Sequence, residues 1–115
     1  MVQVELNFKA RLALGELLGA QARGDLKTLR SYSVAYEQVR ITEDVTAQVE
    51  MQSVRVSPTQ TRLVWDESKA ASAGCTLRLE KQDAERVAAL IENFDGWTLG
   101  DLEWASKAVA DLTQK

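Results

Sequence analysis

The chain has 115 residues, of which 45% are hydrophobic and 27% charged, and its net charge is −3. These values fit one globular domain over residues 1–115 and exclude a disordered chain, which would need fewer apolar residues and more net charge. They also argue against nucleic-acid binding, which usually needs a basic excess, and no apolar run approaches the ~18 residues of a membrane span.

The N-terminal third predicts a strand followed by two helices. Residues 2–6 alternate apolar and polar, which is the period of a half-buried strand. Asn7 is a typical N-cap residue, and the apolar spacing after it predicts a helix over 8–22. Gly24 and Asp25 then mark a helix end and a new N-cap, so a second helix is expected over 26–39. The short loop between them predicts a helical hairpin.

The middle of the chain predicts a short helix and three strands. Thr42-Glu43-Asp44 is typical of a helix start, because acidic residues favour the positive end of a helix. The apolar residues from 49 to 56 fit either the end of that helix or a strand, and the alternation before Pro58 favours a strand over 52–56. A hairpin partner is expected over 61–65, a loop over 67–74 and a further strand over 76–80.

Two amphipathic helices are predicted to close the chain, over 82–94 and 99–112. The apolar stripes expected to face the core are Val87, Leu90, Ile91 and Phe94 on the first, and Leu102, Ala105, Val109 and Leu112 on the second. Thr98 and Asp101 have the spacing of a capping box, and Trp97 and Leu102 that of a hydrophobic staple. The fold expected is α+β, with about five helices and a small, mostly antiparallel sheet of three or four strands.

The residue types leave little for catalysis. Histidine is absent and Cys75 is the single cysteine, which removes histidine-based triads, zinc sites and disulfides. Cys75 opens a strand, so a small packed residue is a better interpretation than a reactive thiol. The acidic pairs at 43–44, 66–67 and 101/103 stand at helix starts and loop edges, where capping is the ordinary role. We therefore predict no enzyme, no cofactor and no metal.

Two segments resemble known ligand-binding loops but lack residues that those loops require. Residues 19–24 have the glycine spacing of a phosphate-binding loop, but Asp25 and Leu26 stand where Lys and Ser or Thr are needed. Residues 93–96 echo part of a calcium loop, but the positions of its first and twelfth ligands hold Ile91 and Leu102. Both segments are better explained as the ends of helices.

The tryptophans are the remaining candidates for a binding surface. Trp104 falls outside the apolar stripe of the last helix, and an aromatic residue outside the stripe is typical of a protein contact. The alternative is that Trp104 covers the edge of its own core. Trp104 is thus the one residue predicted to touch a partner.

The order of these signals resembles a family of small uncharacterised proteins encoded in phages and prophages. The likeness spans most of the chain and rests on four segments: residues 11–18 (RLALGELL), Thr28-Leu29-Arg30, Thr42-Glu43-Asp44, and Leu63-Val64-Trp65. The chain departs from the family at Gly19, where members often have proline, and in a shorter acidic helix start. The resemblance implies a viral or mobile-element origin and supplies no activity and no site residues.

These observations favour a soluble, non-catalytic accessory protein that binds an unidentified protein partner or itself. A cytoplasmic location is expected, in the host cell if the origin is viral, because one cysteine and no apolar N-terminal signal fit a reducing compartment. Two alternatives stay open. One is nucleic-acid binding through a local basic face such as Lys27, Arg30 and Arg40, and the other is a carboxylate-dependent enzyme with three acids converging in a cleft.

Overall fold

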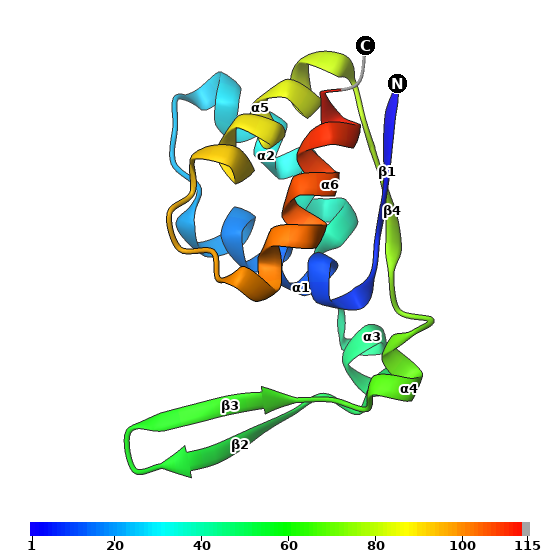
Figure 1. The fold of residues 1–115 in the computed structure, drawn as a ribbon, viewed down its shortest axis with the longest axis vertical. Helices are drawn as coiled ribbons and strands as arrows, with labels where there is room; N and C mark the ends of the chain where they lie inside the picture. Colours follow the sequence, from blue (N-terminus) through cyan, green and yellow to red (C-terminus); the bar gives the residue numbers. More distant parts are fainter. Residues whose placement is uncertain (114–115) are drawn as a thin grey trace.

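A computed structural model describes residues 1–113 and confirms the α+β class (Figure 1). In chain order the elements are β1 (Val2–Leu6), α1 (Phe8–Glu16), the π-helix η1 (Leu17–Gln21), α2 (Leu26–Val39), α3 (Glu43–Gln48), β2 (Gln52–Ser57), β3 (Gln60–Val64), α4 (Glu67–Ala70), β4 (Cys75–Leu79), α5 (Lys81–Asn93), the 3-10 helix η2 (Leu99–Asp101) and α6 (Leu102–Leu112). Most bounds lie within one or two residues of the ranges predicted from the sequence.

The strands form two separate antiparallel pairs instead of one sheet. β1 pairs with β4, from Val2 opposite Leu79 to Leu6 opposite Cys75. β2 and β3 pair only with each other. Residues 67–74 differ from the predicted loop, because Asp66 caps the short helix α4 by accepting from the backbone N–H of Ser68 (2.9 Å). This turn of helix carries the chain away from the hairpin and toward β1.

The main core lies between the β1–β4 pair and helices α1, α2, α5 and α6, which cover one face of that pair (Figure 1). Its most completely buried large side chains are Leu14, Leu77, Leu79, Ile91 and Leu112. The stripes predicted for the last two helices need correction. Leu90 is only half-buried and Leu102 is 60% exposed, while Ala88 and Ala108 are buried in their place. The helix faces that carry these alanines point into the core, because small side chains allow α5 and α6 to pack closely.

A second, smaller core joins α3, α4 and the base of the hairpin to α1. Its buried members are Phe8, Val49, Ala70 and Ala73. Met51 and Trp65, which flank the hairpin strands, pack against this cluster. The rings of Phe8 and Trp65 meet edge to face, with centroids 5.2 Å apart. The start and the end of the hairpin are therefore both anchored on α1.

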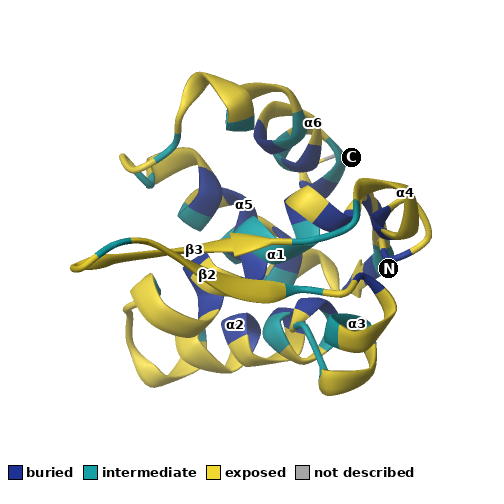
Figure 2. Ribbon diagram, turned by 90° about the horizontal axis from the view of Figure 1, so that it is seen from below, coloured by how far each residue is buried: buried dark blue, intermediate teal, exposed yellow. Residues whose placement is uncertain are grey.

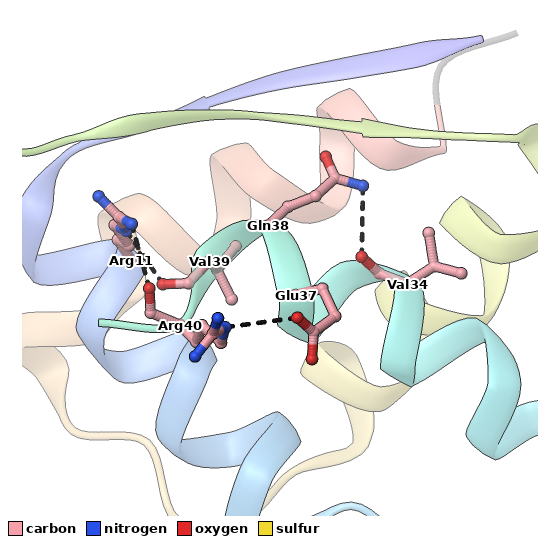
Figure 3. A network of polar contacts seen from close by, with 6 residues as sticks. All are labelled: Arg11, Val34, Glu37, Gln38, Val39 and Arg40. Carbon is pink, nitrogen blue, oxygen red and sulfur yellow. Dashed lines mark hydrogen bonds and ion pairs between the residues drawn. The ribbon is translucent and has the colours of Figure 1, made fainter. Parts of the chain in front are cut away.

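Polar contacts of α2 secure the layers around it. The Gln38 amide donates to the Arg78 carbonyl oxygen (2.8 Å) and its own oxygen accepts from the Arg78 N–H (2.8 Å), so it occupies the outer edge of β4. The same amide also lies 3.3 Å from the Val34 carbonyl oxygen (Figure 3). Two turns earlier on α2, the buried Ser31 hydroxyl donates to Asp83 of α5 (2.6 Å). Paired edges and partnered buried hydroxyls avoid the cost of unsatisfied polar groups.

Candidate functional site

The most distinctive surface feature is the hairpin of β2 and β3, which projects from the helical body (Figure 1). We call residues 51–65 the arm. Between positions 52 and 64 every residue is exposed except the half-buried Ser57 (Figure 2). The strands extend about 20 Å at the usual rise per residue. The radius of gyration is 14.5 Å, above the ~13 Å typical of a compact domain of this length. The arm lies across one end of the longest axis (Figure 1).

The two faces of the arm carry different side chains. Val54 lies opposite Arg62, and Gln52 lies opposite Val64. Because opposed residues share a face and neighbours alternate, these four lie on one face and Leu63 lies on the other. Leu63 helps to line a hollow of about 480 Å³ between the arm and the helices above it. The face with Val54 and Arg62 is therefore turned away from α1 and α2, and at its base Gln52 and Val64 line a hollow with α3.

The edges of the arm are poor templates for further strand pairing. The ladder is interrupted between Arg55 and Ser57, where Val56 is an extra residue. Pro58, which lacks an N–H, occupies the turn. Arginine side chains, a bulge and a proline are features by which exposed strands resist edge-to-edge aggregation. The faces of the arm are thus better suited than its edges to contact a partner.

The entry to the arm has a fixed geometry. Glu50 follows α3 with a φ of 54°, the left-handed conformation that glycine usually adopts at a helix end. Its N–H donates to the Ala47 carbonyl oxygen (3.2 Å), and the Met51 N–H donates to that of Thr46 (3.0 Å). Glu50 also forms an ion pair with Lys69 of α4 (3.0 Å). These contacts set the direction in which the arm leaves the body.

The charge of the arm differs in sign from that of the whole chain. Residues 51–65 contain two arginines, Arg55 and Arg62, and no acidic residue, whereas the chain as a whole carries −3. Neither arginine forms an ion pair with any residue of 1–113. Four large apolar side chains are exposed beside them: Val54, Val56, Leu63 and Val64. The arm is therefore a basic, partly apolar element on an acidic body.

A second exposed apolar surface lies where α5 meets η2 and α6. Leu99 is 89% exposed and Leu102 is 60% exposed. Both line a groove of about 400 Å³, together with Trp97 from the preceding turn and Val109 from α6. Residues 92–106 contain four acidic residues and no basic one. We call this segment the acidic corner.

Trp104, the residue predicted to touch a partner, belongs to this segment and is half-buried. Its indole Nε1–H donates to Asp101 Oδ1 (3.0 Å), and its ring meets that of Trp97 edge to face with centroids 5.2 Å apart. Trp97 in turn stacks edge to face on Phe94 (4.7 Å). Trp97 is thus held by aromatic neighbours, and it lines the same groove as the exposed Leu102, its predicted staple partner. Whether Trp104 touches a partner stays a prediction.

Two of the acidic residues considered for catalysis, Asp101 and Asp66, are engaged in capping contacts. Asp101 accepts from the Trp104 indole and from the N–H and hydroxyl of Thr98, which confirms the capping box and lowers the pKa of its carboxyl. A hydrogen bond from the Ser68 hydroxyl is the main cause that lowers the pKa of Asp66. Burial raises the pKa of the Cys75 thiol, which disfavours the reactive thiolate. Within residues 1–113, no three cysteine or acidic side chains converge in a way that could hold a metal ion.

The basic face proposed from the sequence is not a cluster. Lys27 and Arg30 lie near the start of α2, whereas Arg40 caps its end, about 20 Å away along the helix axis. Arg40 is also paired with Glu37 (3.4 Å; Figure 3). In the segment that resembled a phosphate-binding loop, Gly19 lies in the π-helix, and a Cβ there would come within 2.9 Å of the Tyr36 ring. Close packing explains that glycine.

Comparison with protein-family models, with curated proteins and with solved structures found no match for this chain. The resemblance to phage-encoded proteins and the cytoplasmic location therefore stay predictions. No helix in residues 1–113 combines the length and the apolar character that crossing a membrane requires.

Sequence reasoning found the hairpin but not its exposure, and it missed the acidic corner. The available signal was compositional. Residues 51–65 are the longest run of the chain without an acid, and residues 92–106 lie in the longest run without a base, residues 87–106. Charge counted along the chain, together with two segments of exposed apolar residues, would have singled out both regions.

Proposed function

We propose that this protein is a non-catalytic accessory protein that docks through its arm onto a protein partner with an acidic surface. The observation that carries this proposal is the arm itself: a 13-residue hairpin, residues 52–64, that is exposed on both faces and free of acidic side chains. An isolated two-stranded hairpin is marginally stable in water. This arm is anchored only at its base, so contact with a partner would stabilise the part that projects.

Burial of the arm on a partner would be favourable. Val54, Val56, Leu63 and Val64 are exposed in the single chain. Complete burial of such a side chain contributes about 1.5–3 kcal/mol. Unpaired arginines speed the approach to an acidic surface and reject basic ones, so they supply selectivity. Apolar contact and charge would thus act together on the same element.

Nucleic-acid binding is the second candidate, because the arm is also the most basic element. Two arginines could neutralise about two phosphates, which corresponds to a salt dependence with a slope of about −1.8. That is weak, and the acidic body opposes it. An enzyme would need acids that converge in a cleft. Glu43, Glu50 and Asp66 do line one hollow at the base of the arm, but Glu50 is paired with Lys69 and Asp66 caps α4.

The proposal is tested by photo-crosslinking from the arm. A photoreactive phenylalanine analogue placed at Val56, which is 55% exposed, is compared with the same analogue at Leu26 of α2, which is 65% exposed. We expect protein adducts from position 56 and not from position 26. The adducts should disappear when Arg55 and Arg62 are both changed to Glu. Equal adducts from both positions, adducts that a nuclease removes, or no adducts from position 56 would refute the proposal.

A further inference from the structure

We propose that the acidic partner is a second copy of this chain, whose acidic corner receives the arm. This inference rests on the proposed function and names the occupant of the docking surface. The arm of one molecule would lie over the groove between α5 and α6 of the next. Because the two surfaces are different parts of the chain, the contact is head-to-tail, and repetition produces a ring or a filament.

Charge is the first argument. The arm carries two basic and no acidic residues, and the acidic corner carries four acidic and no basic residues. Glu92 lines the groove itself, and the exposed Asp95 lies in the turn that follows α5. Three cations approach the corner from elsewhere in the chain. Lys9 donates through its ammonium to the Gly100 carbonyl oxygen (3.3 Å), Lys107 lines the same hollow as Glu103, and Arg23 lines the same hollow as Asp95. The negative charge of Glu92 and Asp95 is left without an ion-pair partner within residues 1–113.

Apolar complementarity is the second argument. The groove holds about 400 Å³ and is lined by Ile91, Trp97, Leu99, Leu102 and Val109 among its apolar residues. The face of the arm that is turned away from α1 and α2 presents Val54 beside Arg62. A valine next to an arginine matches an apolar groove with a glutamate at its rim. The two surfaces are therefore both apolar and carry opposite charges, which is the pattern of a specific interface.

Two arms are poorly suited to each other. Pairing of arm edges would place four arginines in one small sheet, and like charges directly opposite each other are destabilising. The bulge at 55–57 and Pro58 also interrupt the edges. Self-association through a symmetric sheet is therefore disfavoured, and docking of the arm on the acidic corner is the arrangement that both charge and shape support.

A charge-swap experiment tests this arrangement by sedimentation velocity on the purified protein. The wild type should associate with increasing concentration, and added salt should weaken the association because the charges are partly exposed. R55E/R62E makes the arm acidic, and E92K/D95K makes the corner basic. Each variant alone should associate at least about 100-fold more weakly, because like charges at an interface cost several kcal/mol. An equimolar mixture of the two should recover association, since each then offers the other an opposite charge.

The matched control is K27E/R30E, which changes the net charge equally at two exposed basic residues outside the arm and the acidic corner. It should associate about as the wild type does. A circular-dichroism melt of every variant establishes that it is folded. A wild type that remains monomeric up to about 1 mM, a concentration at which even a weak contact is populated, would refute self-docking. So would a mixture that fails to recover association.

The two proposals fail separately. If position 56 crosslinks to a different protein while the wild type stays monomeric, the second copy is the wrong partner and the docking function of the arm stands. If position 56 gives no protein adduct although the molecules associate, the arm is not the docking element, and both proposals are refuted.

Discussion

The guanidinium of Arg11 lies against the end of α2, where its Nε donates to the carbonyl oxygen of Val39 at 3.0 Å (Figure 3). The same group donates through Nη2 to the Arg40 carbonyl oxygen and through Nη1 to that of Ala73, each at 3.1 Å. The last carbonyls of a helix have no partner within the helix, and a cation there is favourable. One side chain of α1 thus binds the end of α2 to the segment before β4.

Arg11→Lys tests whether this planar group is required. A lysine keeps the charge but cannot reach three carbonyl oxygens in fixed directions. Hydrogen bonds to charged groups contribute about 1.5–3 kcal/mol, so we expect the free energy of unfolding to fall by about 2 kcal/mol. Urea denaturation measures it. The control is Arg30→Lys at an exposed position, which should change stability by less than about 0.5 kcal/mol. Equal urea midpoints for both variants would contradict the role of Arg11.

Glu50→Gly tests the left-handed residue at the entry to the arm. Non-glycine residues are disfavoured at this φ by about 1–2 kcal/mol. Glycine avoids this cost, but part of the gain in stability is offset because glycine has more conformational freedom in the unfolded chain. The comparison is Glu50→Ala, which removes the same exposed ion pair with Lys69 but keeps a Cβ. We expect Glu50→Gly to be more stable than Glu50→Ala by about 1 kcal/mol in urea denaturation. The reverse order would show that residue 50 does not adopt this conformation in solution.

Gly74→Ala and Gly15→Ala should act with opposite signs. A Cβ at Gly74 would overlap the backbone carbonyl oxygen of Leu6, next to the pair between Leu6 and Cys75, so we expect a loss of about 1–3 kcal/mol. At Gly15 in α1 the nearest atom would be the Val39 carbonyl oxygen at an ordinary 3.8 Å. Alanine there should stabilise the helix by about 0.5–1 kcal/mol. Thermal melts measure both, and a stable Gly74→Ala would contradict the close approach.

Trp104→Phe tests the pH dependence that the Asp101 contact imposes. The Trp104 indole is the main cause that holds the pKa of Asp101 below its ordinary value of 3.8. A lowered pKa in the folded state contributes stability that is present above the unfolded value and is lost as the pH falls through the folded one. Phenylalanine removes the donor, so the pKa of Asp101 should rise in the variant. The stability difference between the proteins should then shrink below about pH 4.

An NMR titration of the Asp101 carboxyl carbon measures the shift directly. Trp104→Phe keeps an aromatic ring that faces Trp97. Any stability that the variant loses through poorer packing is independent of pH, so it can be distinguished from the pH-dependent effect on Asp101. An unchanged Asp101 titration would show that the indole does not bind this carboxylate in solution. Partner binding by the same variant addresses the separate prediction that Trp104 is a contact residue.

Much of the local structure could be predicted because its causes are local. Asn7, Asp25 and Thr42 were expected to cap helices. Each side chain accepts from the backbone N–H three residues later, at Ala10, Thr28 and Val45. Residues that lie within four positions of each other decide such contacts. The apolar periodicity of α2 and α5 is likewise a local property of the sequence. The sequence also excluded histidine chemistry and disulfides, which depend on composition alone.

The positions whose burial or conformation was not foreseen from the sequence are those that depend on which helices and strands contact each other. Leu90 and Ile91 are adjacent apolar residues of one helix, yet only Ile91 is buried, because the orientation of α5 is set by α2 and α6. Glu50 adopts a glycine conformation because both the end of α3 and Lys69 of α4 hold it there. Arg11 looked like an ordinary polar residue of a helix, and only the position of α2 gives its guanidinium three acceptors.

The sequence by itself determined where the strands lie, that the chain is α+β, and that the arm, residues 51–65, has no acidic side chain. The tertiary structure decided that β4 pairs with β1, whose opposing residues Leu6 and Cys75 are far apart in the chain. That pairing leaves β2 and β3 without a third strand or a covering helix, and so exposes the arm. An alternation of apolar and polar residues looks the same in a covered strand as in a projecting one. It reports the direction of each side chain and not what lies on either face of the strand.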